Sequence, residues 1–440
     1  HKTDAFPDKA FKEAWKNVIL FSEHTWGASA SGTDPHSKFT KDLWEGKKAY
    51  ADNASNQSQI LYKQALSPLH VDKGGDFVHV LNTNLWNRTD VVFLDSMVNL
   101  NEKELITRTG EKVETQRLYD GRWAFVAENI PALSSEVYQI VSKKKSSRRF
   151  VSMIAENKIL NNGIVRVEID EVKGTISSFK RVGDSYEYAS NSGLNDYLYT
   201  GRYASDPQGI EQILNIRVLD DGAVAATLRI ESKAPGCNTL WRDVTVYKGI
   251  DRVDICNTLD KQDILDFENV RFVFPFNIQQ PEITMDLAMS EIHPEREQLE
   301  GVNKHYYSLQ NGLAVGDLEH AVCLTTVDAP FVELGSPSGL DYRLNPRHGY
   351  GWWQSAKISP IVYSWVMTNT WRTNYKASQG GTAKFRYSLQ PCNPLDLKLK
   401  QRGAEREMEL VAVASRSSQN IEQLFRLKGR HRIALSSIKP

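Results

Sequence analysis

The sequence predicts a mainly β protein with an N-terminal α-helical segment, and three observations support this fold class. Up to residue 67, apolar residues recur at three- and four-residue spacing, which is typical of one face of a helix. After Pro68, short runs of β-branched residues are separated by Asn, Asp and Gly, which is typical of strands and turns. No strand–helix–strand rhythm follows, so we expect large antiparallel sheets packed as a sandwich.

Residues 1–68 are expected to form a pair of antiparallel helices. Gly27 and Gly32 interrupt the apolar spacing, and the second helix is expected to run to about Leu66. The apolar stripe of the first helix consists of Phe11, Ala14, Trp15 and Val18. A helix pair cannot bury both of its faces, so a third helix or another domain is expected to cover the pair.

Residues 69–150 are expected to form a small β domain and its linker. The runs "FVHVLNT", "TDVVFLD" and "SSEVYQIVS" alternate or are rich in β-branched residues. The basic run from Lys143 to Arg149 is interpreted as a solvated exit linker rather than a binding patch.

Residues 151–391 are expected to form a large β-sandwich. "GIVRVEID" alternates with period two, and "ILNIRVLDDGAVAATLRIES" is expected to be a hairpin with the Asp-Asp-Gly run at 220–222 at its tip. "WRDVTVYKGIDRVDICNTLD" is expected to turn near Gly249. Residues 392–440 contain "EMELVAVAS" and "RHRIALSSIKP", which predict further strands of a pattern that breaks off at Pro440.

Charge and composition exclude several classes of function. Lys and Arg together number 54, as do Asp and Glu, so no net positive field favours nucleic acid as a partner. No apolar run approaches the roughly 20 residues that a membrane-spanning helix needs. The four cysteines are widely spaced and form no Cys-x-x-Cys pair, so zinc at cysteines is not expected. Their pairing is left open.

Several stretches together resemble glycoside hydrolase family 38, the retaining α-mannosidases. They are "SEHTWGAS", "VLNTNLWNRTDVVFLD", "ILNNGIVRVEID" with "GTISSFKR", and "MTNTWRTNYKASQGGTAKFRYSLQP". The run from Asn369 to Asn374 is the most specific of these, and His-Thr-Trp-Gly at 24–27 is the next. The resemblance covers nearly the whole chain, and it implies a helical middle segment, a small β domain and a galactose-mutarotase-like supersandwich.

The resemblance also implies an activity that this chain does not carry by itself. In the family, a preceding barrel-like domain holds the aspartate nucleophile and most zinc ligands, so no catalytic residue is assigned here. The chain is expected to be the C-terminal portion of an α-mannosidase, inactive alone. Its expected partners are a carbohydrate substrate and the missing N-terminal catalytic domain of the same polypeptide. Zinc is expected in the complete enzyme and not in the fragment.

The site residues follow from the resemblance. His24 falls on the position of a zinc ligand, whereas the residues alone favour a packing histidine at a helix end. The best-known branch reads His-His-Asp where this chain reads Glu-His-Thr, so Glu23 is a candidate for the substrate-facing acid. The other candidates for sugar contact are Asn195, Tyr197, Tyr199, Arg372, Asn374 and Tyr375.

The same residue patterns also have purely structural interpretations. Arg372, Asn374 and Tyr375 are as well explained by backbone groups that need partners at a strand-to-loop corner. The dense tryptophans at 352, 353, 365 and 371 favour aromatic core over a sugar surface. Acidic pairs at 170–171 and 220–221 lie in expected turns, where Asp suits the backbone geometry.

Two other functions remain open. A large β-sandwich of this kind also suits a non-catalytic carbohydrate-binding or scaffold module. A mutarotase-like sugar isomerase would need its own histidine and glutamate in a sheet concavity. Its candidate histidines, which no spacing supports, are His70, His79, His305 and His348.

Overall fold

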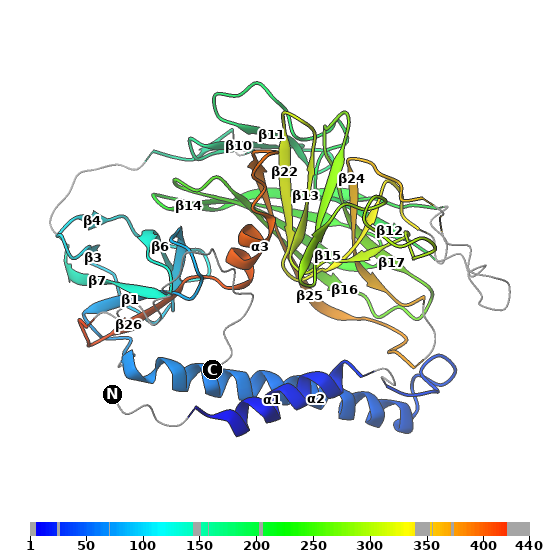
Figure 1. The fold of residues 1–440 in the computed structure, drawn as a ribbon, viewed down its shortest axis with the longest axis horizontal. Coiled ribbons are helices and arrows are strands. Elements are labelled where there is room, and N and C mark those ends of the chain that lie inside the picture. The colour runs from blue at the N-terminus through cyan, green and yellow to red at the C-terminus, as the bar shows by residue number, and fades with distance from the viewer. Residues whose placement is uncertain are drawn as a thin grey trace.

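The computed structural model describes residues 6–23, 27–69, 71–143, 151–156, 158–201, 206–338, 353, 355–370 and 374–419. A pair of helices runs along one side of two β structures, with a further helix between those two (Figure 1). The helices are α1 (Asp8–Phe21), α2 (Lys38–Leu66), the 3-10 turn η1 (Ser67–Leu69) and α3 (Leu399–Glu407).

The smaller β structure, here called the small β unit, contains two antiparallel sheets. The five-stranded sheet has the order β26-β1-β7-β3-β4, and the three-stranded sheet has the order β2-β6-β5. Its strands are β1 (Phe77–Asn82), β2 (Arg88–Leu94), β3 (Lys103–Ile106), β4 (Lys112–Val113), β5 (Gln116–Arg117), β6 (Trp123–Ile130), β7 (Ser134–Ser142) and β26 (Val411–Ser415). Val80, Val92 and Phe125 are fully buried between the sheets.

The larger β structure, here called the large sandwich, contains sheets of nine, five and four strands. Their orders are β13-β14-β15-β16-β25-β22-β21-β18-β19, β12-β17-β24-β23-β20 and β11-β10-β9-β8. The nine-stranded sheet contains β13 (Gln212–Asp221), β14 (Ala225–Lys233), β15 (Cys237–Tyr247), β16 (Val253–Lys261), β18 (Glu282–Leu287), β19 (Ser290–Ile292), β21 (Gly312–Gly316), β22 (Ala321–Thr326) and β25 (Gly381–Cys392). The five-stranded sheet contains β12 (Asp196–Thr200), β17 (Asn269–Pro275), β20 (Tyr307–Ser308), β23 (Phe331–Leu334) and β24 (Ile361–Thr368). The four-stranded sheet contains β8 (Ile154–Ala155), β9 (Ile159–Asn161), β10 (Val165–Ile169) and β11 (Ile176–Arg181).

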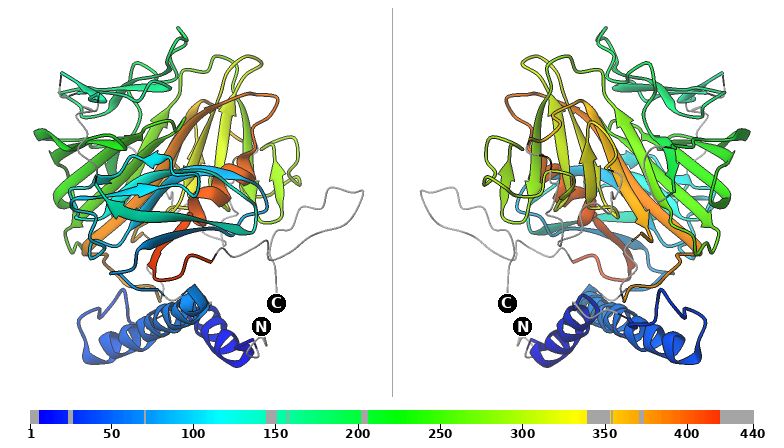
Figure 2. Two further views of the ribbon diagram at one scale, coloured as in Figure 1. Left: turned by 90° about the vertical axis from the view of Figure 1, so that its left-hand side faces the viewer. Right: turned by 90° about the vertical axis from the view of Figure 1, so that its right-hand side faces the viewer.

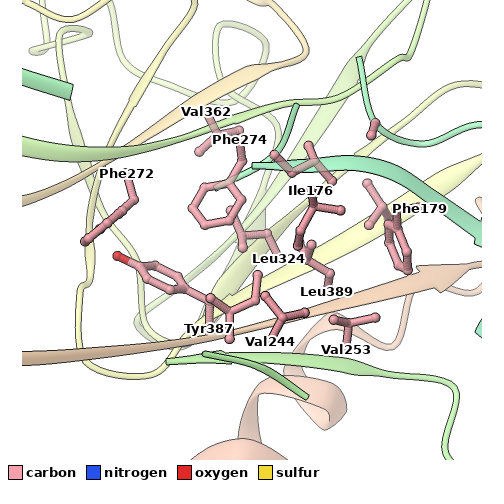
Figure 3. Packing of buried hydrophobic residues seen from close by; sticks show 14 of the residues in the cluster. Ile176, Phe179, Val244, Val253, Phe272, Phe274, Leu324, Val362, Tyr387 and Leu389 are labelled. Atoms are coloured by element: carbon pink, nitrogen blue, oxygen red, sulfur yellow. The ribbon is translucent and has the colours of Figure 1, made fainter. Parts of the chain in front are cut away.

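One hydrophobic core joins the three sheets of the large sandwich. Phe272 and Phe274 of β17 face Tyr387 of β25, with ring centroids 6.1 and 5.1 Å apart (Figure 3). Phe179 of β11 and Val253 of β16 belong to the same core. Because alternate residues of a strand point to opposite faces, the period-two pattern of β10 buries Val165, Val167 and Ile169 here. The expected hairpins β13–β14 and β15–β16 are both present.

The two long helices pair with each other but keep much apolar surface exposed. Ser37 starts α2, and its hydroxyl accepts a hydrogen bond from the Thr40 backbone N–H at 3.3 Å. Of the stripe expected on α1, Ala14 is buried, whereas Trp15 is 62% exposed. Phe39 at the start of α2 is 63% exposed. The pair lies beneath the β structures when seen from either side (Figure 2). Its large exposed apolar side chains agree with the expectation that a helix pair cannot bury both of its faces.

After β25 the chain returns from the large sandwich to the small β unit. "EMELVAVAS" contributes β26, which pairs with β1 as an antiparallel edge strand. Between them lies α3, a helix that the strand pattern does not predict. The expected strand "RHRIALSSIKP" and most of the basic linker lie outside the described residues.

A buried ionic network joins the small β unit to the large sandwich. Asp90 of β2 accepts hydrogen bonds from Arg88 at 2.8 Å and from Arg252 at 2.9 Å. Arg252 also pairs with Asp254 of β16 at 2.8 Å, and Arg406 of α3 reaches Asp254 at 3.3 Å. Burial alone raises the pKa of Asp90, but the two neighbouring guanidinium groups outweigh burial and hold that pKa below its ordinary value.

Replacing Asp90 with Ala leaves buried guanidinium groups without their counter-charge. We expect Asp90→Ala to lower the free energy of unfolding by about 3 kcal/mol or more at neutral pH, measured by urea denaturation. Asp95 of the same unit pairs with Lys73 at the surface, so Asp95→Ala is the matched control and should cost less than about 1 kcal/mol. Equal losses from the two substitutions would contradict the role of the network.

The difference in stability between the native chain and Asp90→Ala is expected to depend on pH. A carboxylate whose folded-state pKa is depressed stabilises the fold above its unfolded-state pKa, and that stability is lost as the pH falls through the folded-state pKa. The difference between the native chain and Asp90→Ala should therefore shrink below about pH 4. A difference that stays constant through this range would show that the carboxylate charge is not the cause.

Candidate functional site

A groove opens where β24 runs into the loop that follows it. Its volume is about 670 Å³, within the range of roughly 300–1,000 Å³ that small-molecule sites have. One wall comes from β24 and the turn before β23, and the rim comes from the loop at 374–379. The residues that define its character are Tyr306, Asp328, Phe331, Trp365, Tyr375 and Lys376.

The wall of the groove is aromatic. Tyr306 and Phe331 stack with their centroids 5.0 Å apart, and Trp365 meets both rings edge-on at 6.1 and 6.4 Å. Trp365 is buried, as the core interpretation of the tryptophans predicts, whereas Phe331 is 37% exposed and Tyr375 is 51% exposed. The groove therefore offers rigid ring surface together with polar groups at its rim.

A buried ion pair holds the aromatic wall from behind. The guanidinium of Arg271 pairs with Glu333, and both side chains are almost fully buried. The same guanidinium lies 4.5 Å from the centroid of the Trp365 ring, close enough for a cation–π interaction. Ser338 donates a backbone N–H to Glu333 at 2.8 Å. Glu333 and Ser338 therefore hold the Arg271 guanidinium in place against the Trp365 ring.

Asn369, the first residue of the most specific sequence motif, anchors the rim loop. Its side-chain amide donates to the backbone carbonyls of Ile264, Asp266 and Ala377 at 3.1, 2.8 and 3.2 Å. Its carbonyl oxygen accepts the backbone N–H of Glu268 at 2.7 Å. Asn369 is itself buried. It satisfies backbone groups at a strand-to-loop corner, which is the structural role that the sequence left open for this motif.

The connection between α1 and α2 packs directly on this rim loop. Ser31 donates its hydroxyl to the Asn374 carbonyl at 3.3 Å, and the Trp44 indole N–H donates to Ser31 at 3.0 Å. A Cβ at Gly27 would lie 2.2 Å from the Asn374 carbonyl oxygen, and the φ of Gly27 is +81°. Only glycine suits both the positive φ and this close approach. The two most specific motifs of the sequence, far apart in the chain, thus meet in space.

The structure leaves part of the predicted site undescribed. His24 and Arg372 lie outside the described residues, as do His70, His348, Trp352 and Trp371. Glu23 ends the described part of the α1 connection, where its carboxylate pairs with Lys47 at 3.1 Å. Within the described ranges, no three His, Cys, Asp or Glu side chains are close enough to hold a metal ion. The zinc position stays a prediction.

Of three candidates for sugar contact, Asn195 directly precedes β12, whereas Tyr197 and Tyr199 lie on that strand, and the first two are buried. Asn195 is 2% exposed and exchanges two amide hydrogen bonds with Asn257, at 3.0 and 2.7 Å. Tyr197 is 1% exposed and donates its hydroxyl to the Pro235 carbonyl at 2.7 Å. Tyr199 donates to Glu268 at 3.1 Å, and burial raises the pKa of its phenol. The polar atoms of these three side chains already have protein partners. Their contact with a sugar stays a prediction.

Glu268 was not predicted, yet it connects β12 to the rim loop. Its carboxylate pairs with Lys261 at 2.7 Å, and its backbone N–H binds Asn369. Burial raises the pKa of Glu268, although Lys261 opposes part of this shift. Nothing in the local sequence marks Glu268, Tyr306 or Phe331, because their roles depend on contacts with distant strands.

Solved structures share this fold, whereas no family model and no curated protein sequence matches the chain. An α-mannosidase from Enterococcus faecalis V583 is 12% identical, with a TM-score of 0.67 over 93% of this chain and 53% of that one. A protein in the glycosyl hydrolase family 38 from Enterococcus faecalis is 12% identical, with a TM-score of 0.65 over 96% of this chain and 56% of that one. The chain spans about half the length of these proteins.

The likeness confirms the predicted fold class, mainly β with an N-terminal helical segment, over nearly the whole chain. At this level of identity it establishes the fold and not the reaction. Among the described helices, none is both long and apolar enough to cross a membrane.

The contact between Gly27 and the rim loop can be tested by substitution. Gly27→Ala strains a positive φ and forces a methyl group onto the Asn374 carbonyl, so we expect α1 and α2 to lose amide protection in hydrogen-exchange measurements. Gly110 also has a positive φ, of +85°, but no atom lies within 4 Å of its Cβ position. Gly110→Ala is therefore the matched control, and unchanged protection of the helices in both variants would contradict the packing described.

Proposed function

We propose that this chain is part of an α-mannosidase-like retaining glycoside hydrolase and forms one wall of its substrate cleft. The observation that carries the proposal is the close approach of Gly27 in "SEHTWGAS" to Asn374 in "NTWRTNY", the two motifs most like that family, at the rim of an aromatic groove. The fold shared with an α-mannosidase over 93% of the chain supports it. The substrate class proposed is an α-mannoside.

The groove suits a sugar on chemical grounds. A pyranose ring has apolar C–H faces and a polar rim of hydroxyl groups. Phe331 and Tyr375 offer exposed ring surface for the C–H faces, while Lys376 and Gln379 bring a donor and an amide to the rim. In this proposal the chain binds and orients the sugar, and excludes water from one side of it.

None of the described residues that line the groove is a carboxylic acid poised for proton transfer. Asp328 lines it, but its carboxylate forms a bidentate pair with Arg386 at 2.8 and 2.9 Å. Burial raises the pKa of Asp328, yet Arg386 outweighs burial and the net shift is downward. A retaining glycosidase needs two carboxyl groups roughly 5–5.5 Å apart. Within the described lining Asp328 is the one carboxylate, so the proposed nucleophile and acid belong to the N-terminal catalytic domain of the same polypeptide.

The uncovered face of the helix pair is the proposed contact with that domain. Trp15 and Ile19 of α1 are 62% and 64% exposed, and Phe39 of α2 is 63% exposed. Large apolar side chains that stay exposed on two paired helices mark an interaction surface more often than a solvated one. Packing another domain on this face would bring that domain beside the α1–α2 connection.

His24 is the proposed zinc ligand of the complete enzyme. A neutral imidazole is a good zinc ligand, and the neighbouring Gly27 is held against the rim loop. Zinc bound there would orient sugar hydroxyl groups. The described residues do not supply a set of ligands of their own, so the remaining ligands are proposed to come from the catalytic domain.

A non-catalytic carbohydrate-binding module is the second candidate, because the groove is built by this chain itself. The mutarotase-like alternative has less support. The ring of His305 accepts the Trp353 backbone N–H at 2.9 Å, and His79 lies 2.7 Å from the Ser417 carbonyl. Both imidazoles are thus engaged by backbone groups.

The first test separates the two leading candidates by activity. The 440-residue chain alone should not hydrolyse aryl α-mannosides with or without added zinc, because a retaining glycosidase needs two carboxyl groups and the described lining of the groove supplies one. A longer polypeptide that includes the catalytic domain should do so. Zinc-dependent turnover by the chain alone would overturn the assignment of catalysis to another domain. Lack of turnover by the longer polypeptide would favour the binding module.

The second test concerns the groove. Phe331→Ala removes exposed ring surface, and we expect it to weaken binding of an α-mannobiose roughly tenfold, as measured by calorimetry. Tyr119 is as exposed as Tyr375, but it packs against Arg229 in a different part of the chain. Tyr119→Ala is therefore the control and should leave binding unchanged. Equal affinity in the native chain and Phe331→Ala would exclude the groove as the sugar site.

A further inference from the structure

Two of the four cysteines lie side by side within the large sandwich. Cys323 is on β22 and Cys392 is the last residue of β25, and these two strands are antiparallel neighbours. The Sγ atoms are 3.3 Å apart. Cys392 is paired in register with Ala321, two residues from Cys323, so the two side chains lie diagonally on the same face of the sheet.

The surroundings favour a bond between these two sulfurs and no other pair. Small side chains at Ala314 and Ala321 and the buried Leu399 of α3 enclose them. Cys237 instead lies 3.6 Å from the Tyr197 hydroxyl, and Cys256 lies 3.9 Å from the Thr258 hydroxyl.

The two thiols differ in acidity in a way that suits exchange chemistry. The hydrogen bond between them, which needs only β22 and β25 to be paired, raises the pKa of Cys323 and lowers the pKa of Cys392. The thiolate is the form that attacks a disulfide, so Cys392 is the nucleophile of the pair.

We propose that Cys323 and Cys392 are a modification site, a thiol pair that forms a disulfide by exchange with a small-molecule disulfide such as oxidised glutathione. The Cys392 thiolate attacks one glutathione sulfur, and a glutathione thiolate leaves. Cys323 then loses its proton and attacks Cys392 in the mixed disulfide, which releases the second glutathione. Two protein thiols give up two electrons and two protons in total, and one oxidised glutathione becomes two reduced molecules.

The bond would fix the point at which the chain leaves the large sandwich. β25 ends at Cys392, and the chain then forms α3 and adds β26 to the small β unit. Cys323 and Cys392 are 1% and 6% exposed, with Leu399 in the same cluster. Exchange therefore takes place before α3 covers the pair, and packing of α3 afterwards protects the bond. This inference does not depend on the proposed reaction.

The test counts free thiols after refolding. The full chain is refolded with a mixture of reduced and oxidised glutathione, freed of small thiols and titrated in denaturant, and tryptic peptides are mapped without reduction. We expect the number of titratable thiols to fall from four to two, with a cross-linked peptide that joins Cys323 to Cys392. Four remaining thiols, or a cross-link that joins a different pair, would overturn the proposal.

Two cysteine variants serve as controls for the thiol count. Cys237→Ala removes a buried thiol outside the pair and should still form the cross-link, leaving one titratable thiol. Cys392→Ser should retain all three of its thiols after the same treatment. Oxidation should raise the melting temperature of the native chain by several degrees and leave that of Cys392→Ser unchanged. Equal shifts in both proteins would count against the bond.

Discussion

The side-chain amide of Asn369 is the constraint on which the candidate site depends. One buried amide contacts four backbone groups, because its two N–H hydrogens are shared among three carbonyls and its oxygen accepts one N–H. The loop after β24 can therefore leave the sheet without stranding polar atoms in the interior. The loop then presents the Asn374 carbonyl to Ser31 and Gly27. Without the Asn369 amide, the rim loop would not be held in a fixed position against the α1–α2 connection.

A second buried polar cluster fixes the larger frame. Asp90 lies between Arg88 of the small β unit and Arg252 of the large sandwich, and Arg406 of α3 extends the network. Buried charges are tolerated only when they are paired. The network therefore favours one arrangement of the small β unit on the large sandwich over arrangements in which these ion pairs are broken. The pairing of β26 with β1 supports the same arrangement, because the segment from β25 through α3 to β26 gives the chain a second connection between the large sandwich and the small β unit.

Periodicity was sufficient to predict the helix pair, the hairpins and the sandwich, because each depends on local spacing of apolar residues. It could not predict α3, whose start lacks a side-chain cap and whose mean hydropathy is low. The resemblance to family motifs identified the rim loop, but it could not distinguish the residues that hold this loop in place from those that would contact a sugar. Asn195 and Tyr197 look like cleft residues in sequence, yet the positive φ of Asn195 and its pairing with Asn257 follow from a core that only the assembled sheets create.

The central claim is that the groove beside the rim loop receives the sugar. Indole N–H signals in a nuclear magnetic resonance titration of the chain with an α-mannobiose test it most directly. Trp365 lines the groove, Trp44 lies beneath the α1–α2 connection, and Trp123 belongs to the small β unit. The account predicts saturable shifts for Trp365 and Trp44 with none for Trp123. Unmoved Trp365 and Trp44 signals at saturating sugar would contradict it.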